Sequence, residues 1–139
     1  MAARWSELEH TGDLAIEVIA GTREELFAEA LTAMSRLMVA PGEIRALDRR
    51  LIAVSAGNDA EALRDLLAAA LNIFIIEGFI WYDAELREND SGSIVARLGG
   101  EKFDSARHQL LEEIKAVTYH RLSVEHTGDG WRAIVVFDA

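Results

Sequence analysis

The chain has 139 residues with 24 acidic and 14 basic side chains, a formal net charge of -10, and no cysteine. Half of the residues are apolar, enough for a single domain spanning residues 1–139 to bury a real core. The absence of cysteine excludes disulfides and Cys-ligated zinc or iron–sulfur sites, and the negative charge disfavours direct binding to nucleic-acid phosphates. Such acidity suits hard cations and basic protein partners, although solubility alone explains it equally well.

Neither a signal peptide nor a membrane span is expected. Residues 1–7 have no apolar core and are followed by further acidic residues. The longest apolar stretch, Leu66 to Ile76, is interrupted by Asn72 and is too short to cross a bilayer. We therefore expect a cytoplasmic protein that has no membrane partner.

The first half of the chain alternates between strand and helix signals. The alternation from Leu14 to Val18 predicts a strand. Thr22, with Glu25 three residues later, predicts the start of a helix with one apolar face, and Pro41-Gly42 is expected to end it.

A second strand–helix pair follows. Arg50 to Ser55 has strand composition, and Asn58 with Glu61 predicts a second helix cap. Gly78 is expected to end this helix. The nearly unbroken apolar run inside it predicts a central helix buried on more than one side.

The second half of the chain favours strands joined by tight turns, with a helical turn expected within residues 104–111. This order predicts an α+β fold in which two main helices pack on a mostly antiparallel or mixed sheet. The expected strands are Phe79 to Leu86, Ser93 to Leu98 with Gly99-Gly100 after it, Ile114 to Glu125, and Trp131 to Phe137.

Three polar features have both a chemical and a structural explanation. Asp13 could ligate a cation with help from His10, or their segment could form a local turn. Lys115 could bind a phosphate or carboxylate, or be an ordinary solvated lysine. Asp138 and the carboxylate of Ala139 offer the oxygens a hard cation needs, unless the terminus is frayed.

Recognisable catalytic motifs are absent from the sequence. There is no Gly-x-Ser-x-Gly elbow, no phosphate-binding loop of the Walker type and no His-Glu-x-x-His pair. The four histidines have no close ligand spacing, so a zinc site is not expected. We accordingly assign no catalytic residue.

Three stretches of the sequence resemble the archease family. The first comprises residues 10–16 and 22–27, the second residues 100–108 and 113–120, and the third residues 130–138. The most specific parts are the string Lys-Ala-Val-Thr-Tyr-His from Lys115 to His120 and the terminal Asp138.

The resemblance implies an archease-like fold and an accessory role for an RNA-splicing ligase. Archeases promote guanylylation and multiple turnover of that ligase in tRNA splicing and RNA repair, without catalysing the reaction themselves. A divalent cation, expected to be calcium, is implied together with a protein partner, and strong direct nucleic-acid binding is not. By position, the implied metal ligands are Asp13, Asp138 and Ala139, and the implied functional or partner-facing residues are His10, Lys115, Tyr119 and His120.

Two positions depart from the usual family pattern. Gly12 stands where archeases commonly have alanine, which relaxes the backbone beside Asp13 but leaves its carboxylate in place. Ala139 stands where isoleucine is common, so a terminal carboxylate is retained while apolar anchoring is lost.

Two other functions are compatible with the residues. A metal-dependent phosphoester hydrolase would use Asp13, Asp138 and His10, but it would also need phosphate-binding cations, for which Lys115 is the only candidate. A chaperone-like binding module would instead expose an apolar surface around Phe79 to Tyr82.

Overall fold

The computed structural model describes residues 1–10 and 13–139, and for Glu9 and His10 it describes the backbone alone. Helices and antiparallel sheets make up the described chain, which confirms the predicted α+β class. In chain order the elements are β1 (Arg4–His10), β2 (Asp13–Ala20), α1 (Arg23–Met38), the 3-10 helix η1 (Pro41–Glu43), β3 (Asp48–Val54), α2 (Asp59–Glu77), β4 (Phe79–Glu88), β5 (Ile94–Lys102), β6 (Ala116–Val117), β7 (Ser123–Thr127) and β8 (Gly130–Asp138).

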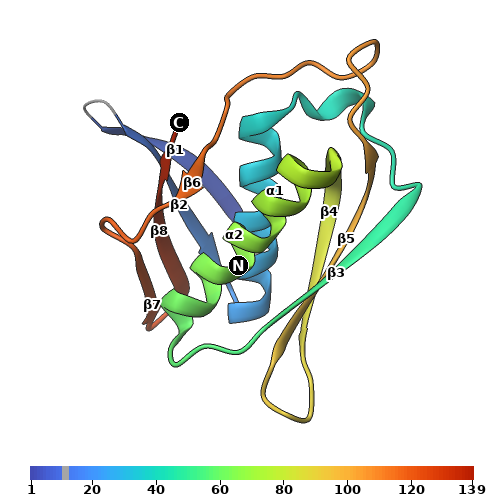
Figure 1. The fold of residues 1–139 in the computed structure, drawn as a ribbon. Coiled ribbons are helices and arrows are strands. Elements are labelled where there is room, and N and C mark those ends of the chain that lie inside the picture. The colour runs from blue at the N-terminus through green and yellow to red at the C-terminus, as the bar shows by residue number, and fades with distance from the viewer. Residues whose placement is uncertain (11–12) are drawn as a thin grey trace.

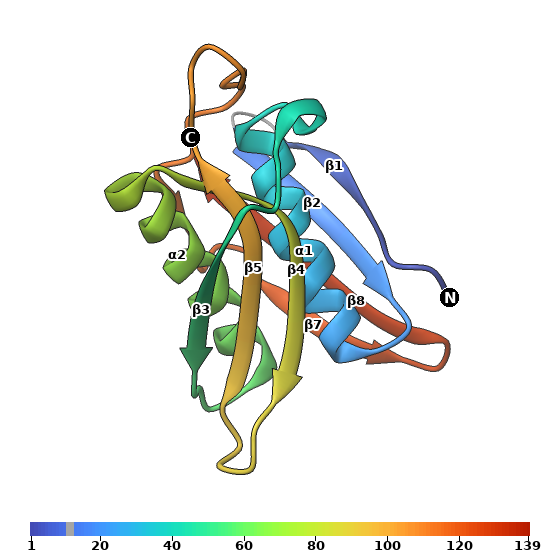
Figure 2. The same ribbon diagram turned by 90° about the vertical axis from the view of Figure 1, so that its right-hand side faces the viewer.

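The strands form two sheets, with both helices between them (Figure 1). The first sheet has the order β1-β2-β8-β6, with β7 also pairing with β8, and the second has the order β3-β5-β4. Each helix contacts strands of both sheets. Figure 2 shows the second sheet in front of the helices and the first sheet behind them. This arrangement places the hydrophobic core along the helix layer.

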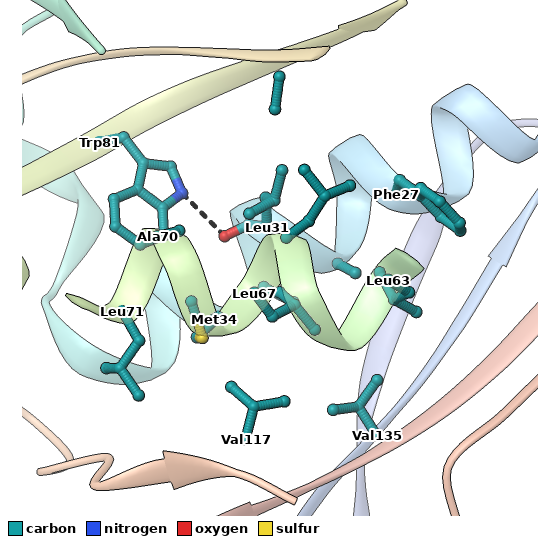
Figure 3. Packing of buried hydrophobic residues seen from close by; sticks show 14 of the residues in the cluster. Phe27, Leu31, Met34, Leu63, Leu67, Ala70, Leu71, Trp81, Val117 and Val135 are labelled. Atoms are coloured by element: carbon teal, nitrogen blue, oxygen red, sulfur yellow. Dashed lines mark hydrogen bonds between the residues drawn. The ribbon is translucent and has the colours of Figure 1, made fainter. Parts of the chain in front are cut away.

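Aliphatic and aromatic side chains from all three layers fill this core (Figure 3). Trp81 is fully buried, and its indole Nε1–H donates to the carbonyl oxygen of Leu31 at 2.9 Å. The hydroxyl of Ser35 donates in turn to the carbonyl oxygen of Trp81. Burial of polar groups is costly unless they are hydrogen-bonded, and none of the buried side-chain nitrogen or oxygen atoms that the structure describes lacks a partner.

Both predicted helix starts are confirmed. The side chain of Thr22 accepts a hydrogen bond from the backbone N–H of Glu25, and that of Asn58 accepts one from Glu61. Gly78 ends α2 in the left-handed conformation, with φ 70°.

The end of α1 differs from the prediction. The helix ends at Met38, and Pro41-Gly42 instead begin the short η1 helix. The N–H of Leu111 donates to the carbonyl oxygen of Met38, and that of Glu112 to Leu37. A distant loop therefore satisfies carbonyl groups that the helix end leaves open.

Strand β1 was not predicted from the sequence. Its two large apolar residues, Trp5 and Leu8, pair with Val18 and Ala15 of β2. Because three positions separate Trp5 from Leu8, the two side chains lie on opposite faces of the sheet. The simple alternation that marks a half-buried strand is consequently missing.

Two other predicted strands needed correction. Gly99 and Gly100 lie inside β5, not after it, and the partner strand β4 has a register shift between Trp81 and Asp83. The segment Ile114 to Glu125 is not one strand, because a turn separates β6 from β7. Only a single turn forms within residues 104–111, where the N–H of His108 donates to the carbonyl oxygen of Asp104.

Apolar exposure also differs from what the sequence suggested. Helix α2 contacts both sheets as expected, but its last turn leaves Ile75 57% and Ile76 79% exposed. The exposed surface proposed around Phe79 to Tyr82 is wrong, because the first three of these four residues are buried in the core. None of the described helices is long and apolar enough to cross a membrane.

Candidate functional site

The pairing of β2 with β8 brings the two ends of the chain together. The antiparallel register runs as far as Leu14 opposite Phe137, and this last pair is directly adjoined by Asp13 and Asp138, the first residue of β2 and the last of β8. On the other side of β2, Asp13 pairs with His10 of β1. Figure 1 shows the C-terminus at the end of the sheet where β1 ends and β2 begins.

Buried residues next to Asp138 anchor the strand ends. Phe137 and Val117 are 1% and 3% exposed and pair with each other across β8 and β6. Asp13, Asp138 and Ala139 are exposed. Asp13 and Asp138 therefore lie at the same end of two neighbouring strands.

Lys115 lies beside the same strand end. Its backbone N–H donates to the carbonyl oxygen of Asp138 at 2.7 Å, and its side chain is exposed. Within the described part of the chain, the ammonium group has no ion pair. The structure thus places Lys115 next to the terminal aspartate, although Asp138 lies 23 positions further along the chain.

Tyr119 and His120 continue from this segment into the turn after β6. The N–H and hydroxyl of Thr118 both donate to the carbonyl oxygen of Val136, and the N–H of His120 donates to the hydroxyl of Thr118. Tyr119 is 63% exposed and His120 is exposed as well. The turn closes with a hydrogen bond from the N–H of Leu122 to the carbonyl oxygen of Tyr119.

The donor set at this strand end suits a hard cation. Two aspartate side chains and the carboxylate of Ala139 offer only oxygen atoms, which calcium and magnesium prefer. No group of three or more His, Asp or Glu side chains is placed to hold a metal among residues 1–8 and 13–139, whose side chains the structure describes. The candidate therefore depends on the terminal carboxylate as its third donor.

The expectation about Gly12 concerns a residue that the structure does not describe, and the side chain of His10 is likewise outside the description.

Comparison with known proteins decides the family. The model of the archease protein family (MTH1598/TM1083) matches residues 5–139. The chain belongs to the archease family. It is 32% identical to protein archease of Methanosarcina acetivorans over 139 residues, covering 97% of this chain and 95% of that protein. Identity to protein archease of Pyrococcus abyssi is 34% over 140 residues, covering 97% and 98%.

A solved structure shows the same archease fold. The solution structure of protein 1598 from Methanobacterium thermoautotrophicum aligns with a TM-score of 0.78 and covers 97% of this chain and 98% of that one. Sequence identity in that alignment is 22%, so the likeness concerns the fold. The family match includes all three stretches in which the sequence resembled archeases.

A buried polar network supports the loop between β5 and β6 of this archease. Glu101 is 6% exposed, and its carboxylate accepts hydrogen bonds from the side chain of Arg107 and from the backbone N–H of Arg45 at 2.7 Å. The imidazole Nε2 of His108 lies 3.1 Å from the same carboxylate, while its Nδ1 accepts from the N–H of Asp104 at 2.8 Å. Hydrogen bonding by Arg107, aided by Arg45 and His108, lowers the pKa of Glu101 to about 2.

Sequence reasoning missed this network because its members look ordinary in sequence. A glutamate followed six positions later by an arginine is common on protein surfaces, and only the fold buries the pair. Glu101 and His108 belong to the stretch 100–108 that resembles archeases, but no role was assigned to either residue. Spacing alone offered no signal for the network.

Proposed function

We propose that this archease is an accessory protein that activates an RNA-splicing ligase by promoting its guanylylation and multiple turnover. The observation that carries the proposal is the family match over residues 5–139. It is supported by the strand register, which gathers the positions implied by the resemblance at one end of the first sheet. In this role the chemistry takes place on the ligase.

The strand end has the donors for a divalent cation, which we propose is calcium, held by Asp13, Asp138 and the carboxylate of Ala139. Three negative charges at neighbouring strand ends repel one another, and a bound cation would neutralise them. The aspartates themselves keep the termini of β2 and β8 charged and exposed to a partner. Lys115 adds one positive charge next to this acidic end, at a position fixed by the backbone of Asp138.

The charge of the whole chain fits a protein partner better than a nucleic acid. A net charge of -10 attracts a basic surface such as the RNA-binding face of a ligase and repels RNA itself. Complementary charge speeds association and fixes orientation more than it raises affinity. We therefore propose that the activator binds the ligase and not its RNA substrate.

The hydrolase alternative has less support. This alternative would use His10, which pairs with Asp13 across β1 and β2, together with Asp13 and Asp138. Lys115 is a single cation, whereas phosphoester hydrolysis needs charge stabilisation together with an activated water. The accessory role requires neither.

The test is a guanylylation assay with radiolabelled GTP, a purified RNA-splicing ligase and this protein. We expect label on the ligase alone, and faster labelling when the archease is added. Asp13→Asn and Asp138→Asn should slow this labelling, while Asp90→Asn, a matched change of an exposed aspartate in the turn between β4 and β5, should not. Label on the archease, or joined RNA in the absence of ligase, would show that the protein is an enzyme and refute the proposal.

A further inference from the structure

Arg64, in the first half of α2, connects that helix to the segment that carries Lys115 and Tyr119. Its Nε–H donates to the carbonyl oxygen of Val117 at 3.1 Å. Its guanidinium carbon lies over the ring of Tyr119, 4.7 Å from the ring centroid. A second guanidinium nitrogen lies 3.2 Å from the carboxylate of Asp65, which orients the group further.

The hydrogen bond from Arg64 to Val117 lies at the edge of the first sheet, on the side of β6 away from β8. β6 has two residues and lies at the edge of the first sheet, with β8 as its neighbour. Val117 pairs with Phe137 of β8, and the carbonyl group that bonds to Arg64 is the one on the open side of β6. A two-residue edge strand is weakly held by its own ladder, so a side-chain donor on its open side restricts its movement.

The contact with Tyr119 fixes an exposed aromatic side chain. With 63% of its surface exposed, this ring would ordinarily sample several rotamers. The guanidinium covers one ring face and leaves the other side of the residue to solvent, an arrangement that holds the ring in one orientation. Tyrosines presented in a fixed orientation are frequent anchors of protein interfaces, because little conformational entropy is lost on binding.

We propose that Arg64 is a positioning residue, which holds Tyr119 and the segment from Lys115 to His120 in the orientation that the partner protein contacts. This inference rests on the proposed function, because it takes the partner to be the ligase. Arg64 itself is only about one-quarter exposed and acts through Tyr119. The planar guanidinium makes the hydrogen bond and the ring contact at the same time, and lysine cannot replace it in both.

The first experiment needs no partner. Nuclear magnetic resonance should show the Nε–H of Arg64 protected from solvent exchange and the ring of Tyr119 in one environment in the wild-type protein. Arg64→Lys and Arg64→Met should give Tyr119 ring signals that approach random-coil values. Arg36→Met is the matched control, because Arg36 lies 6.0 Å from the ring centroid of Tyr82, in the other sheet. Unchanged Tyr119 signals in both Arg64 variants would refute the positioning role.

The second experiment titrates the ligase with each variant and separates the half-activating concentration from the maximal stimulated rate. We expect Arg64→Met to raise the half-activating concentration about five- to tenfold and to leave the maximal rate unchanged. The increase follows because the variant loses a partly shielded cation–π contact that orients Tyr119 before binding. The melting temperature should fall by no more than about 4 °C, the result of one lost hydrogen bond.

A double variant tests whether Arg64 acts through Tyr119. If it does, Arg64→Met combined with Tyr119→Ala should be no worse than Tyr119→Ala alone. Additive losses, or wild-type activation by Arg64→Met when Tyr119→Ala is impaired, would refute the inference. If the wild-type protein fails to activate the ligase, the proposed function fails, while the nuclear magnetic resonance experiment still decides whether Arg64 orients Tyr119.

Discussion

Among the side chains that the structure describes, Glu101 is the only buried acid, and three groups contact its carboxylate. An ionised carboxylate is tolerated in such a place because hydrogen bonds replace its hydration. The loop it holds leads from β5 to β6 and so to Lys115. Glu101 therefore holds the first part of the loop that carries Lys115.

This environment predicts a specific dependence of stability on pH. The folded pKa of Glu101, about 2, is depressed below the ordinary value of 4.5. Its contribution to stability is therefore complete above about pH 5 and is lost as the pH falls toward 2. Glu101→Gln should lower the free energy of unfolding by about 2 kcal/mol at neutral pH and make its decline in acid less steep.

The measurement is urea unfolding from pH 7 down to pH 3, with Glu112→Gln as the control. Glu112 is an exposed acid in the same loop, and its substitution should change stability by no more than about 0.5 kcal/mol. A decline for Glu101→Gln as steep as that of the wild type would contradict the assignment of Glu101 as the responsible group.

Lys115 offers a test of function that is separate from stability. The chain has two lysines, and the exposed Lys102 at the end of β5 is a natural control. We expect Lys115→Ala to leave the melting temperature within about 2 °C of the wild type, since an exposed side chain contributes little to folding. Multiple-turnover ligation should nevertheless fall with Lys115→Ala and not with Lys102→Ala. Equal activity of the two variants would identify Lys115 as an ordinary surface lysine.

At the scale of single elements, features that depend on nearby residues were predictable from the sequence, and features that depend on a partner strand were not. Helix caps depend on residues three positions apart, so Thr22 and Asn58 were identified from sequence. The two glycines were expected after the strand Ser93 to Leu98, but pairing with the neighbouring strands continues through them. β1 was missed for a similar reason, because Trp5 and Leu8 pack on opposite faces that only the complete sheet provides.

Gly100 should be among the least replaceable residues of the second sheet. An ideal Cβ at this position would lie 2.0 Å from the carbonyl oxygen of Ile80 and 2.6 Å from the Cα of Trp81. Both obstacles are backbone atoms, which cannot move aside without distorting β4. Gly100→Ala should therefore destabilise the protein by roughly 3 kcal/mol or more, as measured by chemical unfolding.

The control for this change is Gly42→Ala in η1, where a Cβ would meet no atom within 4 Å. That variant should remain within about 0.5 kcal/mol of the wild type. Similar stabilities for the two variants would mean that β4 and β5 do not approach as closely as the structure shows.

The whole molecule determines the candidate site, because neither end of the chain forms it alone. β2 and β8 lie side by side although more than 100 residues separate them in sequence. The resemblance to archeases identified Asp13, Lys115 and Asp138, whereas composition and spacing could not distinguish them from a turn, a surface lysine and a frayed end. Arg64 and Glu101 were beyond both kinds of reasoning, since their partners become neighbours only after folding.

A cation bound between the ends of β2 and β8 should stabilise the folded chain as a whole. Such a site exists only when the two strands are paired, so the cation binds the folded state and not the unfolded one. At a calcium concentration about a hundredfold above Kd, the stabilisation would be about 2.7 kcal/mol, and it should raise the melting temperature by several degrees relative to protein in excess chelator.

Asp13→Asn and Asp138→Asn should remove this calcium-dependent rise, because each takes away one charged ligand. In chelator, Asp138→Asn should also melt no lower than the wild type, since it relieves repulsion at the strand ends. Asp90→Asn, which changes the same charge in the distant β4–β5 turn, should keep the full rise. If calcium raises the melting temperature of all three variants as much as that of the wild type, the cation binds elsewhere and the paired strand ends are not its site.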